Sequence, residues 1–225
     1  MTGKASPQLV TKIPVDLELR LARLHNNPQP LGGPAVLWFY ESFFPVFWIA
    51  FLVYWRIKAA TAKTNERLEP AGSRILRLLI FVIVIVLFST TRIPLHWLYL
   101  QLWPAGLWPF WLGAAVMIAG LLFAVWAREH LGGNWSSEVT IKQGHELITT
   151  GPYAIVRHPI YTGMLAGLVG SAIALSEVRG FVACALVFLI LWPKLRLEEE
   201  WMRSQFGEAY AAYASRTRAL VPYLL

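Results

Sequence analysis

The stretch Gly106–Ala127, GLWPFWLGAAVMIAGLLFAVWA, decides the fold class, because it is a long apolar run without a single charged residue. At about 1.5 Å per residue, a helix of this length extends roughly 33 Å, enough to cross the hydrocarbon core of a bilayer. The whole chain agrees, since 56% of its residues are hydrophobic and only 15% are charged. A soluble domain carries about 25% charged residues. The sequence therefore predicts an integral membrane protein.

Four further apolar segments run near Val36–Trp55, Ile75–Thr91, Ile160–Ser176 and Gly180–Leu197. The last two are joined only by 177–179, which indicates a tight helical hairpin. The predicted fold class is an all-α integral membrane protein with about five transmembrane helices. We expect an N-terminal tail at 1–34, transmembrane helices 1–3 at 35–127, and a cofactor-binding region at 128–225. That last region contains helices 4 and 5 and a C-terminal helix, and the lone Cys184 is expected to be a buried structural thiol.

Charge orients the predicted spans. Most Lys and Arg residues fall in the loops after the first and third spans and in the tail after the fifth. With five spans these regions share one side, which the positive-inside rule assigns to the cytoplasm. We therefore expect a multi-pass protein of a bacterial-type inner membrane or an equivalent one. The net charge of +7 is then explained by Lys and Arg residues that set the orientation of the spans in the membrane. The expected partners are the lipid bilayer and a lipophilic substrate, with no nucleic acid and no obligatory protein partner.

Two polar regions remain for chemistry. The loop Arg128–Pro159 ends in Arg157-His158-Pro159, and Pro159 suits the first position of the fourth helix. His158 would then cap that helix beside free backbone N–H groups, where an anion binds well. The second region is Glu198–Glu200, where the fifth span leaves the membrane and carboxylates must be hydrated or paired. Together they complement a zwitterionic amino-acid group such as that of S-adenosylmethionine.

At this point an ordered set of motifs resembles a known family. The motifs are Gly144-His145-Glu146-Leu147, Gly151-Pro152-Tyr153, Arg157-His158-Pro159-Ile160-Tyr161-Thr162-Gly163, Glu198-Glu199, Phe206-Gly207-Glu208-Ala209-Tyr210, Tyr213 and Pro222. Across Ala127–Leu225 this set resembles the isoprenylcysteine carboxyl methyltransferase family of integral-membrane methyltransferases. An ordered combination is far more specific than any of its pieces.

The resemblance implies S-adenosyl-L-methionine as the methyl donor, with S-adenosyl-L-homocysteine as its product, and a cytoplasmic cofactor pocket between the third loop and the C-terminal tail. The implied cofactor-binding residues are His145, Glu146, Leu147, Ile148, Tyr153, His158, Pro159, Ile160, Tyr161, Glu198 and Glu199. Glu198 or Glu199 would hold the ammonium group of the cofactor. The family also uses an arginine shortly before its glutamates to bind the acceptor.

The residues assigned to catalysis are Arg196 and Arg157, as cations that orient an acceptor carboxylate, together with Glu198. Arg196 precedes Glu198 by two positions and Lys194 precedes it by four, so the sequence leaves open which of the two takes the arginine's role. Glu199 and Arg203 are four apart and could simply form a helical ion pair.

The leading functional hypothesis is methyl transfer to a lipophilic acceptor at the cytoplasmic membrane face. An isoprenylcysteine-type carboxylate, a phospholipid amine and a thiol all remain open as acceptors. The alternatives are an NADPH-dependent membrane reductase of the sterol reductase type and a non-catalytic lipid-binding membrane protein. The acidic run at 198–200 argues against binding the 2′-phosphate of NADPH. No metal is predicted, because the spacing of the histidines matches no usual zinc site.

Overall fold

A computed structural model describes residues 34–60, 71–90, 92–132 and 147–221. The chain forms two compact units, Met1–Glu41 and Ser42–Leu225, and the packing below is that of the second unit. The helices are α2 (Pro34–Ala60), α3 (Ala71–Ser89), η1 (His96–Tyr99), α4 (Leu107–Leu131), η3 (Gly151–Ala154), α5 (Pro159–Leu175) and α6 (Val178–Arg216). Within the described ranges there are helices and isolated bridges but no strand, so the predicted all-α fold is confirmed.

Each of the five predicted apolar segments forms one helix. Among the residues that the structure describes, three stretches are long and apolar enough to cross a membrane: Glu41–Ala59 in α2, Leu107–Leu131 and Val178–Arg216. The other two segments give shorter apolar helices, Leu78–Ser89 within α3 and Pro159–Leu175. The chain is thus a multi-pass membrane protein.

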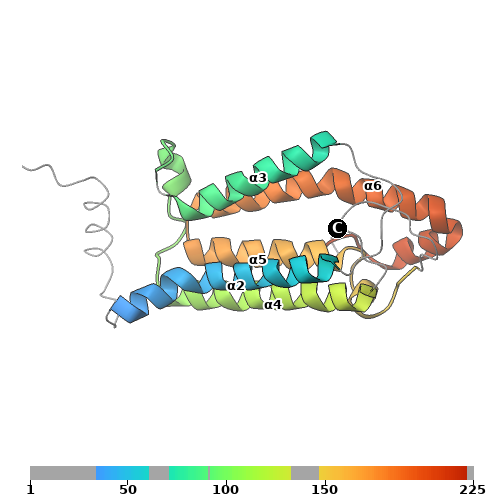
Figure 1. The fold of residues 1–225 in the computed structure, drawn as a ribbon, viewed down its shortest axis with the longest axis horizontal. Helices are drawn as coiled ribbons and strands as arrows, with labels where there is room; N and C mark the ends of the chain where they lie inside the picture. Colours follow the sequence, from blue (N-terminus) through green and yellow to red (C-terminus); the bar gives the residue numbers. More distant parts are fainter. Residues whose placement is uncertain (1–33, 61–70, 91, 133–146, 222–225) are drawn as a thin grey trace, which may run out of the picture. The chain divides into compact units, whose positions relative to one another are not determined.

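Small residues set the contact between α4 and α5, which lie side by side and run in opposite directions (Figure 1). A Cβ atom added at Gly120 would lie 2.6 Å from the carbonyl oxygen of Gly163. One added at Gly170 would lie 2.5 Å from the carbonyl oxygen of Gly113. Close backbone approach through Gly is the usual way for membrane helices to gain van der Waals contact, since lipid supplies no hydrophobic force between them. This helix pair is the frame on which the start of α5 is held.

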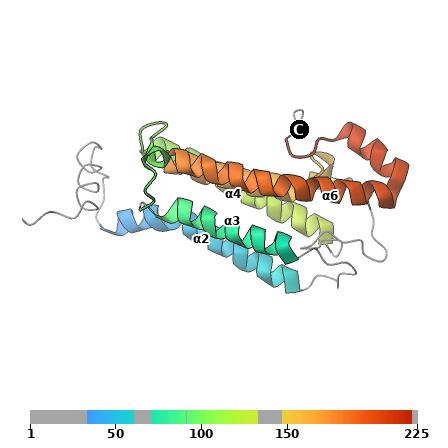
Figure 2. The ribbon, with the colours of Figure 1, turned by 90° about the horizontal axis from the view of Figure 1, so that it is seen from above.

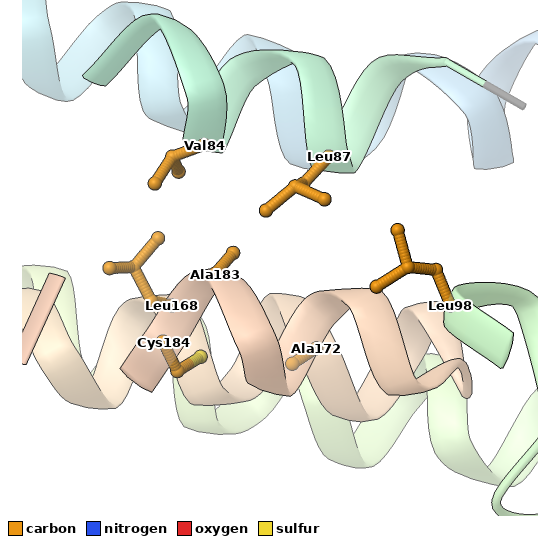
Figure 3. Packing of buried hydrophobic residues seen from close by; sticks show 7 residues of the cluster. All are labelled: Val84, Leu87, Leu98, Leu168, Ala172, Ala183 and Cys184. Carbon is orange, nitrogen blue, oxygen red and sulfur yellow. The ribbon is translucent and has the colours of Figure 1, made fainter. Parts of the chain in front are cut away.

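The remaining helices pack around this pair. From α2, the indole Nε1 of Trp48 donates a hydrogen bond of 3.0 Å to the hydroxyl of Ser171 on α5. Helix α3 lies along the first half of α6, and an apolar cluster joins them to α5 and η1 (Figure 3). Its buried members are Val84, Leu87, Leu98, Leu168, Ala172, Ala183 and Cys184. The prediction that Cys184 is a buried thiol is confirmed.

The tight connection between α5 and α6 is also confirmed, and it holds a buried ion pair. Helix α5 ends at Ser176, which adopts a left-handed conformation (φ 62°), and α6 begins at Val178. Arg179 donates to Glu177 at 2.6 Å and to the backbone carbonyl of Leu87 at 3.0 Å. The side chain of Arg179 is only 4% exposed, because it closes this end of the bundle.

Helix α6 joins two predicted elements. The sequence predicted a fifth span ending near Leu197 and a C-terminal helix after it, and α6 runs on through both to Arg216, with a kink at Gly207 (φ 48°). Glu, Leu and Arg are good helix formers, which explains the continuation. The part of α6 before the kink extends roughly 44 Å at about 1.5 Å per residue, about one and a half times the thickness of a bilayer core. The second half of α6 therefore reaches beyond the apolar bundle and turns back after the kink (Figure 2).

Candidate functional site

A short loop and turn lead into α5. Gly151 has φ +59°, and a Cβ atom there would lie 2.8 Å from the ring of His130, at the end of α4. Pro152 and Tyr153 follow and are buried. The hydroxyl of Tyr213, on the last part of α6, donates a 2.7 Å hydrogen bond to the carbonyl of Tyr153. The turn η3 is thus held between the end of α4 and the end of α6.

The segment after α6 fastens the start of α5. The backbone N–H of Arg157 donates to the carbonyl of Arg218 at 2.8 Å, and that of His158 donates to the carbonyl of Ala219 at 3.0 Å. The hydroxyl of Thr162, one turn into α5, donates to the carbonyl of Leu220 at 2.7 Å. The backbone around the helix start is therefore occupied by the protein's own chain. This backbone pairing was not predicted, because no motif marks it.

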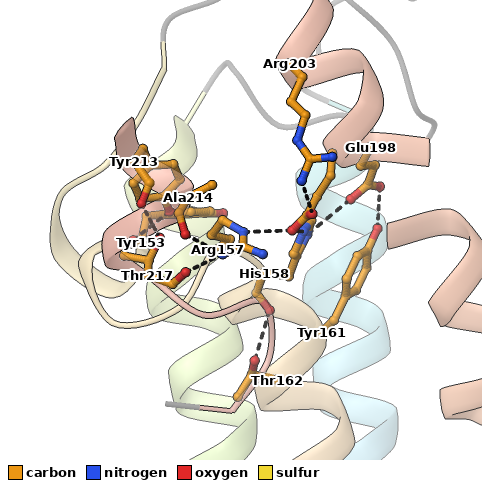
Figure 4. A network of polar contacts seen from close by, with 11 residues as sticks. Tyr153, Arg157, His158, Tyr161, Thr162, Glu198, Arg203, Tyr213, Ala214 and Thr217 are labelled. Carbon is orange, nitrogen blue, oxygen red and sulfur yellow. Dashed lines mark hydrogen bonds and ion pairs between the residues drawn. The ribbon is translucent and has the colours of Figure 1, made fainter. Parts of the chain in front are cut away.

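His158 is the N-cap residue of α5, and Pro159 is its first helical residue, as predicted. The imidazole of His158 faces two carboxylates of α6 (Figure 4). Its Nδ1 lies 3.5 Å from Oε2 of Glu198, and its Nε2 lies 3.4 Å from Oε1 of Glu199. The negative charge beside this helix start thus comes from the protein itself. The two polar regions picked out in the sequence meet at one place.

Glu198 has further partners on its own side of the cluster. The hydroxyl of Tyr161 donates a 2.5 Å hydrogen bond to Oε1 of Glu198. The ammonium group of Lys194 lies 3.9 Å from the same oxygen and 5.7 Å from the centroid of the Tyr161 ring. The Tyr161 ring in turn stacks on that of His158, with centroids 5.7 Å apart. Glu198 keeps 24% of its side chain exposed, so this carboxylate remains within reach of a ligand.

Glu199 is held more firmly. Arg157 donates to its Oε1 at 2.7 Å, and Arg203 lies 3.5 Å from its Oε2, which confirms the predicted helical pair. Arg157 also donates to the backbone carbonyls of Ala214 (3.2 Å) and Thr217. Only 11% of the Glu199 side chain is exposed. Glu199 and Arg157 therefore join the start of α5 to both parts of α6.

The electrostatics of the cluster favour positive charge on His158. Burial by itself would lower the pKa of this histidine, but the hydrogen bonds and charges of Glu198 and Glu199 outweigh burial and raise the pKa above its ordinary value. Burial also raises the pKa of the Tyr153 hydroxyl, which stays neutral. The site thus combines two carboxylates with a histidine that readily carries a proton.

Other predicted residues lie around or away from this cluster. Leu147, Ile148 and Ile160 are half-buried and precede or begin α5. His145 and Glu146 lie outside the described residues. The two candidate acceptor-binding cations near Glu198 differ: Lys194 is 14% exposed and faces Tyr161, whereas the exposed Arg196 lies over the ring of Trp192, 5.3 Å from its centroid.

The donor set fits an amino-acid-type cofactor. Glu198 and Glu199 can accept hydrogen bonds from an ammonium group, and the aromatic faces of Tyr161 and His158 lie beside them. Within the described part of the chain, no group of three or more His, Cys, Asp or Glu residues has the arrangement of a metal site.

Comparison with known proteins gives the relatives of this chain. The family model for phospholipid methyltransferases matches residues 108–209. The chain is 30% identical to the nickel-cobalt-cadmium resistance protein NccN of Alcaligenes xylosoxydans xylosoxydans, over 51% of this chain and 53% of that protein. It is 30% identical to protein-S-isoprenylcysteine O-methyltransferase B of Arabidopsis thaliana, over 50% of this chain and 58% of that protein.

The chain therefore spans little more than half the length of these curated relatives. A solved structure of the eukaryotic intramembrane Ras methyltransferase ICMT (isoprenylcysteine carboxyl methyltransferase) is also similar. It matches with a TM-score of 0.48 and 22% identity, over 71% of this chain and 55% of that one. The resemblance that the sequence motifs suggested is confirmed by the relatives.

Proposed function

Because the chain is a relative of the isoprenylcysteine carboxyl methyltransferase-like membrane proteins, we propose that it is a methyltransferase. Its proposed methyl donor is S-adenosyl-L-methionine, and its acceptor is a lipophilic molecule that reaches the site from the bilayer. The relatives named protein-S-isoprenylcysteine O-methyltransferase support transfer to a carboxylate oxygen. The name of NccN does not mention methyl transfer. The proposed acceptor class therefore rests on the charged residues of the site.

The observation that carries this proposal is the meeting of the motif at the start of α5 with the two glutamates of α6. Glu198 and Glu199 lie within 3.5 Å of His158 and offer carboxylates to the ammonium group of the donor. Glu198 is the better candidate for direct contact, since Glu199 is already bound by Arg157 at 2.7 Å. Tyr161 would position Glu198 through their 2.5 Å hydrogen bond.

We propose Lys194 as the cation that orients the acceptor. Its ammonium group is on the face of α6 that carries Glu198 and meets Tyr161, so an anion bound there would lie next to the donor. Arg196 stacks on Trp192 instead, and Arg157 is occupied with Glu199 and two backbone carbonyls. A cation placed this way favours a carboxylate acceptor over an amine, because an amine would be repelled when protonated.

When bound, the donor would supply a sulfonium methyl group for transfer to the acceptor oxygen. The residues of this chain have no bond to make or break, so their task is to orient the two reactants and exclude water. Proximity and orientation can supply about 7–11 kcal/mol of the barrier. A carboxylate needs no base, which matches a site whose described groups are carboxylates and cations. A surrounding of low polarity assists, since charge is neutralised in the transition state.

The site is proposed to face the cytoplasm. One end of the helix bundle carries the site, and α2, α4 and the first half of α6 all end there. The same end carries the basic residues Lys58, Arg128, Lys194 and Arg203. Clustering of Lys and Arg at one end is the signature of the cytoplasmic side.

A binding experiment tests the proposal. Detergent-purified protein is titrated with S-adenosylhomocysteine by calorimetry, together with Glu198→Gln and the matched control Glu208→Gln at an exposed position of α6. We expect micromolar binding to the unaltered protein and to the control, and loss of at least tenfold in affinity in Glu198→Gln. Binding of NADPH in place of S-adenosylhomocysteine would favour a reductase, and binding of neither nucleotide would contradict the methyltransferase proposal.

A further inference from the structure

The imidazole of His158 lies between two carboxylates, with one ring nitrogen directed at each. The contacts are 3.5 Å to Glu198 and 3.4 Å to Glu199, and only 10% of the His158 side chain is exposed. A neutral imidazole carries a proton on one nitrogen only, so it would turn a lone pair toward one of the carboxylates. An imidazolium is attracted by both carboxylates as an ion pair, and the buried Nε2, which forms no hydrogen bond with the described residues, lies 3.4 Å from Glu199. The position between two carboxylates therefore favours a protonated ring.

Cations already outnumber the carboxylates beside this ring before any ligand arrives. Glu198 and Glu199 carry two negative charges, while Lys194 lies 3.9 Å from Glu198, and Arg157 at 2.7 Å and Arg203 at 3.5 Å lie beside Glu199. Charged and titratable side chains of three segments belong to this cluster. They are Tyr153 and Arg157 in the segment before α5, Tyr161 on α5, and Lys194, Glu198, Glu199, Arg203 and Tyr210 on α6. A further cation at these carboxylates would meet more positive than negative charge.

We infer that the imidazolium of His158 occupies the carboxylate pair in the free protein, and that the ammonium group of a bound amino-acid-type ligand replaces it, so that binding releases the His158 proton. The inference rests on the proposed function, since it takes that ligand to be the methyl donor or its product. The proton passes from the ring nitrogen to water, and no covalent bond to carbon changes.

Two physical points support the coupling. Like charges within a few ångströms disfavour each other, so an ammonium group beside Glu198 weakens the hold of His158 on its proton. The carboxylates also keep the pKa of free His158 above its ordinary value, although burial opposes this. The distances of 3.4–3.5 Å between His158 and the two glutamates exceed the roughly 2.7–2.9 Å of a tight charge-assisted hydrogen bond. Replacing the imidazolium by an ammonium group therefore costs little interaction energy.

The test counts protons. S-adenosylhomocysteine is titrated by calorimetry at one pH near neutrality in several buffers that differ in ionisation enthalpy, and the slope of observed enthalpy gives the protons released. We expect release approaching one proton per ligand, and an affinity that rises by up to about tenfold per pH unit below the His158 pKa. 5′-Methylthioadenosine has no ammonium group and should bind without release.

Two variants assign the proton. His158→Asn keeps a good N-cap residue, so α5 should still begin at the same place. In this variant the enthalpy of binding should no longer depend on the buffer, whereas the exposed control Glu208→Gln should behave like the unaltered protein. If His158→Asn does not fold, NMR titration of the histidines in ligand-free protein replaces it. One histidine should then have a raised pKa that falls in Glu198→Gln.

The outcomes separate the two proposals. If S-adenosylhomocysteine binds without releasing a proton, or if His158→Asn releases as many protons as the unaltered protein, the coupling is wrong and the methyltransferase proposal stands. If the ligand does not bind although NMR shows a protonated His158, the proposed function fails and the coupling fails with it. A neutral His158 in the free protein at pH 7 also overturns the inference.

Discussion

The three cationic residues considered for binding the acceptor differ in the partners of their side chains. Arg157 is bound on several sides, Arg196 stacks on Trp192, and Lys194 faces Tyr161 and Glu198. The motifs in the sequence identified Glu198 and the neighbouring arginine, but spacing alone could not choose between positions 194 and 196. That choice depends on which side of α6 meets α5, and only the packing of the two helices determines it.

The contrast between Lys194 and Arg196 can be measured. Lys194→Met should raise the KM for a carboxylate acceptor, for which an S-farnesylated, N-acetylated cysteine serves as probe. The rise should be about 10- to 100-fold, because a hydrogen bond to a charged group contributes about 1.5–3 kcal/mol. Arg196→Met is the matched control and should change KM by less than about threefold. Equal effects of the two variants would remove Lys194 from its proposed role.

The pH dependence of stability follows from His158. Its pKa is raised in the folded protein, so the stabilisation is fully present below the ordinary histidine pKa of about 6.5 and is lost as pH rises through the raised value. We expect the melting temperature in detergent to fall over this range above pH 6.5. The fall should be smaller in His158→Asn, measured by thermal unfolding from pH 6 to pH 9. An identical pH profile in both proteins would show that His158 does not contribute.

At the scale of helices, the five apolar helices could be predicted because each is an apolar run bounded by polar residues. The ends of the helices were less predictable. The hairpin between α5 and α6 was visible in its short connection, but the burial of Arg179 was not, since it depends on carbonyl groups at the end of α3. A C-terminal helix was predicted, but its continuity with the fifth span was not, because the chain turns polar after Leu197.

The close glycine contacts between α4 and α5 predict that a larger residue there lowers the stability of the protein. In Gly120→Ala, the added Cβ would lie 2.6 Å from the carbonyl oxygen of Gly163, so the helices must separate. Overpacking of this kind costs about 1–3 kcal/mol, which lowers the melting temperature by roughly 2–10 °C. Gly106→Ala is the control, because its Cβ meets nothing within 4 Å. A melting temperature unchanged in both variants would mean that this contact is looser than described.

At the scale of the whole molecule, composition and charge predicted a multi-pass membrane protein with its polar regions on one side. The structure brings the loop before α5 and the second half of α6 together, as the sequence suggested. What the sequence could not supply is the pairing of Arg157 and His158 with Arg218 and Ala219. These are backbone hydrogen bonds between distant segments, and they leave no signature in side-chain type.

Orientation is testable with single cysteines in a Cys184→Ala background, since Cys184 is the one cysteine of the chain. Ala211→Cys lies at the site end and Leu100→Cys at the other end, and both positions are exposed. In intact bacterial cells, a membrane-impermeant maleimide should label Leu100→Cys, but it should reach Ala211→Cys only after the membrane is opened. The opposite pattern would place the site outside.

The backbone pairing of Arg157 and His158 with Arg218 and Ala219 also bears on how the protein is made. The ribosome delivers all five apolar helices to the insertion machinery before it adds these last partners. The start of α5 must therefore wait in the membrane without them, and its backbone is fastened only after Arg218 and Ala219 have been added. Assembly of the site is thus a late, post-insertion event, and a translation arrest shortly before Arg218 would leave a bundle without a finished site.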